Sequence, residues 1–193
     1  YIYLNKKSYL HNIEVLKNLS RKELCLIVKA NAYGHGLEWA VQKAKESGIK
    51  WFAVASVDEG IQVKKVYGES SVLLLAEPSI SQLENVKGNH IDLTVYNESF
   101  IDTLIEAGDE YSVHLKIDTG MHRLGCPPEK FYDLYKKIID SNLNLIGICT
   151  HFPLADTDEA ETKKSIELFE KTISDIDTTN MILHVDNSAS SLY

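Results

Sequence analysis

The most informative stretch of the chain is VKANAYGHGL, residues 28–37, which follows directly on an apolar run at residues 24–28. Such a run is typical of a buried strand, and this one ends on a single lysine, Lys29. Two glycines then bracket His35, where a helical pattern begins. Backbone N–H groups at a helix start can hold a phosphate, and a lysine amine can form a Schiff base with a carbonyl. The stretch therefore predicts a strand, a ligand-binding turn and a helix, in that order.

The same alternation of short apolar runs and longer amphipathic segments continues along the chain. We expect strands near residues 24–29, 51–55, 72–76, 91–95, 111–117, 143–149 and 181–185. We expect helices near residues 6–19, 35–47, 56–66, 79–87, 97–107, 127–141 and 158–175. In the last helix, Asp158 three residues before Glu161 suits a capping box. Strands that alternate with helices predict an α/β domain with a parallel sheet and right-handed crossovers.

The alternation by itself fits either an open doubly wound sheet or a closed barrel. The placement of polar residues favours the barrel, because Lys29, Lys116, His151 and Asn187 each lie at or near the C-terminal end of a different predicted strand. In a barrel these ends converge on one mouth, whereas the first and seventh strands of an open sheet rarely share a site. We therefore expect residues 1–193 to form one domain, a TIM-type barrel that stops after about seven strands.

Composition excludes several classes of function. With 193 residues and 44% hydrophobic content, the chain can bury one sizeable core. A balance of 20 basic against 28 acidic residues gives a net charge of −8, which argues against nucleic acid or an anionic membrane as partner. No signal-peptide pattern and no run of ~18 apolar residues is present, so we expect a cytoplasmic protein. The seven histidines and three cysteines lack metal-site spacing, and no Gly-x-Ser-x-Gly hydrolase motif occurs.

Four motifs resemble the signatures of one family. Residues 28–36 closely resemble the pyridoxal phosphate (PLP) attachment signature of the alanine racemase family. Three further motifs are similar to that family's other signatures, in the same order: KIDTGMHRLG at 116–125, THF followed by AD at 150–156, and HVDNSA at 184–189. Pro153 stands where the family more often has a small residue. The resemblance covers effectively the whole chain, and it implies a (β/α)8 barrel followed by a β-rich C-terminal domain that this chain lacks.

The resemblance also implies roles for individual residues. Lys29 would be the catalytic lysine that forms the Schiff base with PLP. The Tyr33 hydroxyl would bind the cofactor phosphate together with Asn187 and Ser188, and His151 would lie against the pyridine ring. The purely structural alternatives are that Tyr33 packs beneath the following helix and that Asn187 caps a helix.

Lys116 and Arg123 would support the site. In the family the lysine is often a carbamate that orients the arginine, whose fork suits a substrate carboxylate or a cofactor oxygen. Asp118 points the same way as Lys116 from an alternating strand. An internal ion pair between Lys116 and Asp118 is therefore the alternative interpretation.

The function implied is a PLP-dependent racemase that interconverts L- and D-alanine for bacterial cell-wall synthesis, as a homodimer in the full-length protein. Racemisation needs an acid/base group on each face of the reacting carbon, and Lys29 would serve one of them. In the family the second is a tyrosine from the partner's C-terminal domain, so we expect this chain alone to be inactive. A racemase for serine or lysine, a PLP-dependent decarboxylase and a non-catalytic PLP-binding barrel are the alternatives.

Overall fold

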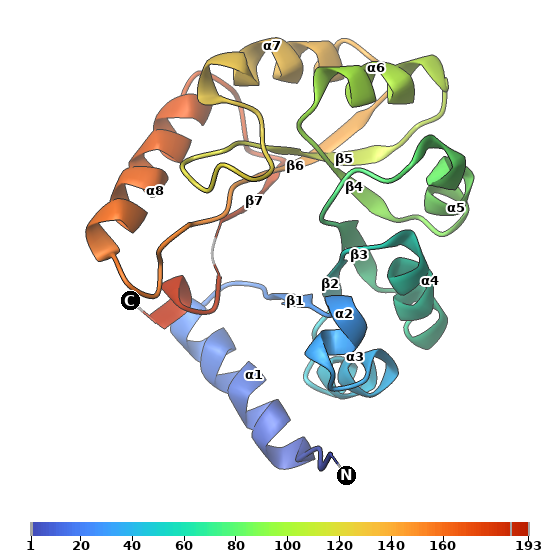
Figure 1. Ribbon diagram of the computed structural model, residues 1–193, viewed down its shortest axis with the longest axis vertical. Coiled ribbons are helices and arrows are strands. Elements are labelled where there is room, and N and C mark those ends of the chain that lie inside the picture. Colours follow the sequence, from blue (N-terminus) through green and yellow to red (C-terminus); the bar gives the residue numbers. More distant parts are fainter. Residues whose placement is uncertain (1, 186, 193) are drawn as a thin grey trace. The chain divides into compact units, whose positions relative to one another are not determined.

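The computed structural model describes residues 2–185 and 187–192, and strands alternate with helices through this range (Figure 1). The strand order in the sheet is the order of the sequence, β1 to β7. The strands are β1 Cys25–Ile27, β2 Trp51–Val54, β3 Ser71–Leu74, β4 Asp92–Val95, β5 Ser112–Lys116, β6 Asn144–Cys149 and β7 Ile182–His184. The helices are α1 Lys6–Ser20, α2 Lys29–Tyr33, α3 Leu37–Glu46, α4 Val57–Val66, η1 Ile80–Gln82, α5 Leu83–Gly88, α6 Glu98–Glu106, α7 Pro128–Ile139, α8 Glu159–Ile173 and η2 Ser190–Leu192. The chain divides into two compact units that meet in sequence between Asp92 and Leu93.

In the first unit, β1, β2 and β3 pair in parallel, and α3 packs beside α4 (Figure 1). Three of the four residues in both β2 and β3 are buried. Strands buried on both faces read as continuous apolar runs, which is why the sequence pattern located them. The buried face of α3 follows helical spacing, with Leu37, Ala40, Val41 and Ala44 turned inward.

In the second unit, β5, β6 and β7 pair in parallel and β4 pairs with β5. The register of β5 against β6 shifts between Val113 and His114, because His114 lies opposite Gly147. A Cβ atom on Gly147 would lie 2.2 Å from Nδ1 of His114. The irregular register and the glycine together make room for a buried imidazole in the sheet.

Side-chain caps begin several helices, as the sequence predicts for the last one. Asp158 accepts a hydrogen bond from the backbone N–H of Glu161 at 3.0 Å, so the cap at the start of α8 is confirmed. The Glu161 carboxylate pairs with Lys164 at 2.9 Å. Only half of the expected capping box therefore forms.

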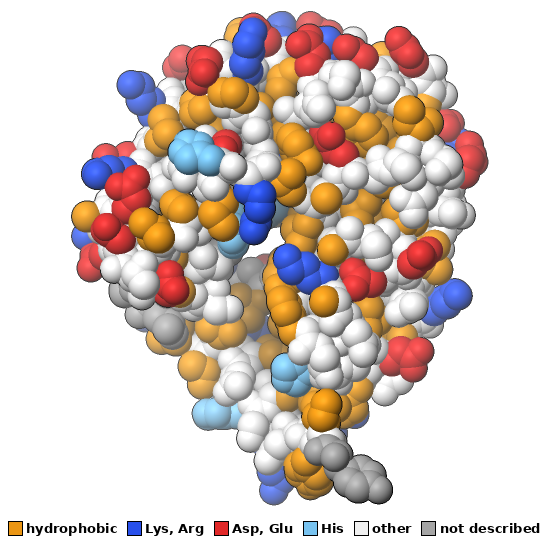
Figure 2. All heavy atoms as spheres, viewed as in Figure 1, with side chains coloured by type: hydrophobic (Ala, Val, Ile, Leu, Met, Phe, Trp, Pro, Cys, Tyr) orange, Lys and Arg blue, Asp and Glu red, His pale blue; other side chains and the backbone are white. Residues whose placement is uncertain are grey.

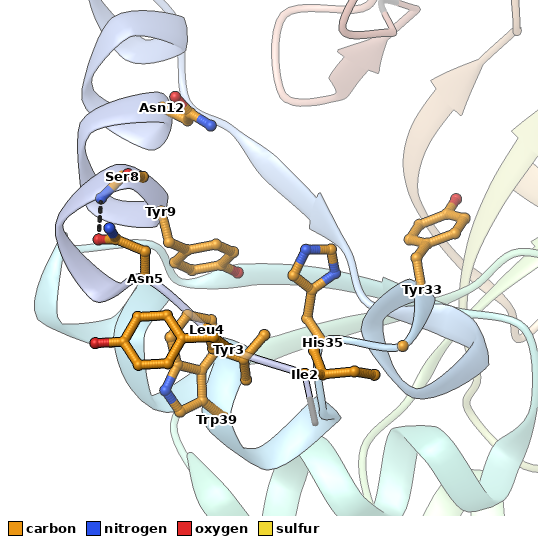
Figure 3. A pocket seen from close by; sticks show the side chains of 11 residues that line it. Ile2, Tyr3, Leu4, Asn5, Ser8, Tyr9, Asn12, Tyr33, His35 and Trp39 are labelled. Atoms are coloured by element: carbon orange, nitrogen blue, oxygen red, sulfur yellow. Dashed lines mark hydrogen bonds between the residues drawn. The ribbon is translucent and has the colours of Figure 1, made fainter.

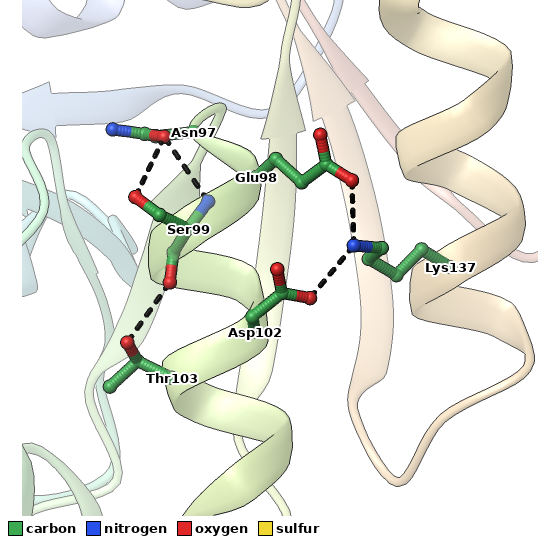
Figure 4. Close-up of polar contacts among 6 residues, drawn as sticks. All are labelled: Asn97, Glu98, Ser99, Asp102, Thr103 and Lys137. Atoms are coloured by element: carbon green, nitrogen blue, oxygen red, sulfur yellow. Dashed lines mark hydrogen bonds and ion pairs between the residues drawn. The ribbon is translucent and has the colours of Figure 1, made fainter.

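Ion pairs connect two helices of the second unit, α6 and α7. Lys137 on α7 contacts Glu98 at 2.7 Å and Asp102 at 2.8 Å, both on α6 (Figure 4). These two hydrogen bonds raise the pKa of Lys137, Asp102 having the larger effect and Glu98 the next. Figure 2 shows acidic and basic side chains interspersed on the visible face, without a broad basic region.

The structure confirms the predicted α/β fold class, with seven strands near the seven predicted positions. One boundary was wrong in a way that matters for function. The first strand was expected to continue to residue 29, but it ends at Ile27, and Lys29 opens a separate turn. Among the described residues no helix is both long and apolar enough to cross a membrane.

Candidate active site

Lys29 begins a left-handed turn. The four residues after it, Ala30 to Tyr33, have φ between 51° and 54°, and Gly34 continues at 87°. A left-handed backbone costs roughly 1–2 kcal/mol for each residue that carries a Cβ. Four such residues in succession persist only where the surrounding structure holds them, and strain of this kind concentrates at functional sites.

Hydrogen bonds at both ends hold this turn in place. At its start, the N–H of Val28 donates to the carbonyl of Ala53 on β2 at 2.9 Å. At its end, the Asn31 side-chain oxygen accepts from the N–H of Leu37, the first residue of α3, at 2.8 Å. The Asn31 carbonyl also accepts from the N–H of Gly36 at 3.0 Å. The turn is therefore tied to the neighbouring strand and to the next helix, with the half-buried Lys29 at its start.

Tyr33 lies on the same turn, with 61% of its surface exposed. A hollow of about 420 Å³ lies beside the turn, lined by the N-terminal segment, α1 and α3. Figure 3 shows Tyr33 extended away from the ring pair Tyr9 and Trp39, whose centroids are 4.9 Å apart and whose planes are tilted by 59°, while His35 lies between. The Tyr33 side chain is thus largely open to solvent, and the alternative of a tyrosine packed beneath the following helix is not what the structure has.

In the second unit, Lys116 ends β5 and Arg123 lies on the loop that follows. The loop is closed at its base by two hydrogen bonds of 2.9 Å, from the N–H of Cys126 to the carbonyl of Lys116 and from the N–H of Asp118 to the carbonyl of Cys126. Gly125 makes this closure possible, because it has φ of 137° and a Cβ there would lie 2.6 Å from the backbone nitrogen of Asp118. The loop presents Arg123 as an exposed side chain.

Asp118 organises this loop through its carboxylate. Its Oδ1 atom accepts from the backbone N–H groups of Gly120 and His122, each at 3.0 Å, and Oδ2 lies 3.5 Å from the His122 ring. Burial alone would raise the pKa of Asp118, but the N–H groups of His122 and Gly120, together with the His122 ring and the N–H of Met121, more than offset it, so the pKa is lowered. The carboxylate therefore acts as the hydrogen-bond acceptor that holds this turn.

His151 follows β6, and the residue before it, Thr150, belongs to a buried network of hydroxyl groups. The Thr150 hydroxyl donates to the carbonyl of Ile117 at 2.9 Å and lies 2.7 Å from the Thr119 hydroxyl. The Ser165 hydroxyl on α8 donates to the Thr119 carbonyl at 2.9 Å. This network joins the end of β6, the loop after β5 and α8. Sequence reasoning missed it, although Thr119 and Thr150 lie within two of the motifs.

A pair of histidines lies beneath these loops. Nδ1 of His114 on β5 and Nε2 of His184 on β7 are 2.9 Å apart, with the rings at 73°. Burial lowers the pKa of His114 to about 3, with a further contribution from His184. Burial, followed by the charge of Lys116, lowers the pKa of His184 to about 4. Both rings are therefore neutral at pH 7, and an N–H of one ring donates a hydrogen bond to the bare nitrogen of the other.

Asn187 and Ser188 follow β7, and Asp186 of the same motif lies outside the described residues. The Asn187 side-chain oxygen accepts from the N–H groups of Ala189 and Ser190, each at 3.1 Å. Asn187 thus caps the 3-10 turn η2, Ser190–Leu192. The exposed Ser188 hydroxyl is the group that this turn presents outward.

The predicted site residues therefore fall into two groups, each at the C-terminal ends of parallel strands. Lys29 and Tyr33 share the turn after β1 in the first unit. The second unit carries Lys116 and Arg123 after β5, His151 after β6, and Asn187 and Ser188 after β7. Within the described ranges, no group of three or more histidine, cysteine or acidic residues is arranged to hold a metal ion.

The chain is similar to known racemases over nearly its full length. The family model described as alanine racemase, N-terminal domain, matches residues 4–193. This chain belongs to that family. An alanine racemase of Treponema denticola is 35% identical over 192 residues, which cover 93% of this chain and 51% of the relative. An amino-acid racemase of Enterococcus faecalis is 34% identical over 90% of this chain and 25% of the relative.

Solved structures agree with the family assignment. The crystal structure of alanine racemase from Oenococcus oeni matches 98% of this chain and 56% of its own, with a TM-score of 0.89 and 28% identity. The chain thus corresponds to the N-terminal barrel domain of the alanine racemase family and spans about half the length of the relatives it matches. The resemblance of the four motifs to this family is confirmed.

Proposed function

We propose that this chain is the cofactor-binding portion of a PLP-dependent amino-acid racemase that acts on alanine. The observation that carries the proposal is the position of Lys29, at the end of β1 and at the start of a strained, firmly held turn. Membership of the racemase family supports the reaction class. Association into a homodimer, a cytoplasmic location and a role in cell-wall synthesis belong to the same proposal for the longer protein.

The donor set fits PLP. The cofactor needs a lysine amine for its aldehyde and hydrogen-bond donors for its phosphate. The chain has the half-buried amine of Lys29 and the exposed hydroxyls of Tyr33 and Ser188 at strand ends. The Asn187 side-chain oxygen is already engaged by its own turn, so we propose that this turn contributes through its amide group and through Ser188. His151 would contact the ring.

When bound, PLP supplies an electron sink that acidifies the Cα–H bond of an attached amino acid. We propose that Lys29 first holds the cofactor and, once released from it, moves a proton at Cα on one face. Arg123 would bind the carboxylate through its guanidinium fork, and Lys116 would orient Arg123. Inversion needs a second acid/base group on the opposite face, which we assign to the longer protein.

Deuterium exchange tests this assignment. The chain is incubated with PLP in D2O and with L- or D-alanine separately, and the Cα label and the configuration are measured. We expect one enantiomer to exchange without inversion, because Lys29 serves one face only. Exchange should be lost in Lys29→Ala and retained in Lys22→Ala, which removes an exposed lysine of the same unit.

Absence of exchange in a folded sample that has bound PLP would contradict the proposal. Inversion by the chain alone would show that it holds both acid/base groups, contrary to our expectation. The relative from E. faecalis is named an amino-acid racemase, so racemisation of another amino acid is the second candidate. Parallel reactions with serine and lysine measure this directly.

A further inference from the structure

The Glu59 side chain joins two backbone segments of the first unit. Its Oε1 atom accepts a hydrogen bond from the N–H of Ala30 at 2.6 Å, and its Oε2 atom accepts from the N–H of Ala55 at 3.0 Å. Ala55 follows the end of β2, and Ala30 follows Lys29 in the sequence. One carboxylate therefore connects the end of β2 to the peptide group immediately after Lys29.

The position of Glu59 is itself well fixed. It lies in the first turn of α4, where its N–H donates to the Ser56 hydroxyl, the helix cap, at 3.3 Å. A Cβ atom on the next residue, Gly60, would lie only 2.7 Å from Cδ1 of Ile91. The start of α4 is therefore packed closely against its neighbours. An acidic side chain also suits the positive end of a helix dipole. The half-buried carboxylate thus projects from a rigid support.

The turn after Lys29 needs such a support. Ala30 is the first of four consecutive non-glycine residues with positive φ, and its N–H points to the Glu59 carboxylate. Hydrogen bonds from backbone N–H groups to an ionised carboxylate are stronger than those between neutral groups. The bond to Ala30 fixes the plane of the Lys29–Ala30 peptide, and through it the direction in which the Lys29 side chain leaves the backbone.

We propose that Glu59 is a positioning residue for Lys29: it holds the left-handed turn in the conformation that presents the lysine amine to PLP. This inference rests on the proposed role of Lys29. A capping box at the start of α4 would use Glu59 differently, because its carboxylate would return to the N–H of Ser56. Here both oxygens reach other segments instead, one of them the turn that carries the lysine.

Two substitutions separate positioning from simple helix stability. Glu59→Leu keeps most of the size of the side chain but removes both acceptor oxygens, so it cannot accept from the N–H of Ala30 or of Ala55. Ser56→Ala is the matched control, because it removes the cap of the same helix and leaves the bond from Ala30 to Glu59 in place. Thermal unfolding of both variants measures how much stability each one loses.

The first readout is hydrogen exchange of the Ala30 amide, followed by NMR without any cofactor. The second is the rate at which PLP and borohydride give the pyridoxyl adduct on Lys29, measured by peptide mass mapping. We expect Glu59→Leu to lose protection at Ala30 and to form the adduct at least about tenfold more slowly, since small misplacements of reacting groups cost this much or more. Ser56→Ala should match the wild-type chain in both.

Equal adduct rates for Glu59→Leu and the wild-type chain would overturn the inference, as would an equal slowing by Ser56→Ala at matched stability. If the wild-type chain forms no adduct on Lys29, the proposed function fails and the positioning role fails with it. The two failures are distinguishable. If only the positioning role fails, Lys29 of the wild-type chain still forms the adduct, whereas if the proposed function fails it does not.

Discussion

Nδ1 of His114 lies 2.9 Å from Nε2 of His184, and this contact joins two strands across 70 residues of sequence. Neither histidine can be protonated without cost, because burial lowers both pKa values, to about 3 for His114 and about 4 for His184. In the unfolded chain each has the ordinary value near 6.5. The pair therefore links folding of the second unit to pH.

The first prediction is acid sensitivity. Below about pH 6.5 the two histidines bind protons in the unfolded chain but not in the folded chain. The free energy of unfolding therefore falls as pH drops toward 4, and above pH 6.5 these two groups make no pH-dependent contribution to it. Each histidine contributes a slope of up to about 1.4 kcal/mol per pH unit. Urea unfolding between pH 7 and 4.5 measures it. His114→Gln should flatten the slope, and His11→Gln, at an exposed site, should not. An unchanged slope in His114→Gln would contradict this assignment.

The second prediction concerns the loop that carries Arg123. Gly125→Ala should destabilise the chain by roughly 2–5 kcal/mol, because φ is 137° and the new methyl group would overlap the Asp118 backbone. Gly88→Ala, at a helical position with open space around it, should be stabilising by about 0.4–1 kcal/mol. Urea midpoints of the two variants give the comparison. Equal stability of the two would mean that the loop does not need its glycine.

The third prediction concerns the buried hydroxyl network. Thr150→Val keeps the shape of the side chain but leaves the Ile117 carbonyl and the Thr119 hydroxyl without this partner, at a cost of about 1–3 kcal/mol. Thr103→Val is the control: its hydroxyl donates to the carbonyl of Ser99 on the exposed side of α6 (Figure 4), and we expect a change within about 0.5 kcal/mol. Thermal unfolding of both variants distinguishes them, and a neutral Thr150→Val would remove the network from this account.

The sequence predicts the strands well because parallel strands that are buried on both faces read as apolar runs. The strand predicted at residues 51–55, for example, exceeds β2, Trp51–Val54, by one residue at its C-terminal end. The left-handed turn could not be predicted in the same way. Ala30 and Ala32 are not residues that favour positive φ, and the hydrogen bond from Ala30 to the distant Glu59 helps to keep the turn in place.

Contacts between distant segments explain what else was missed in the candidate site. Glu59 reaches Ala30 across 29 residues, and nothing in the local pattern specifies that reach. A signal was nevertheless present, since Ser56 three residues before Glu59 is a helix-start pattern directly after a strand. The positions of Lys29 and Asn187 at strand ends were predictable, because each follows a short apolar run.

The measurement that tests the central claim most directly is borohydride reduction of the chain with PLP, followed by peptide mass mapping. We predict one pyridoxyl group on Lys29, absent from Lys29→Ala and unchanged in Lys22→Ala. Circular dichroism establishes that all three samples are folded. A folded wild-type chain that carries no adduct on Lys29, or one that is labelled equally at exposed lysines, would contradict the account.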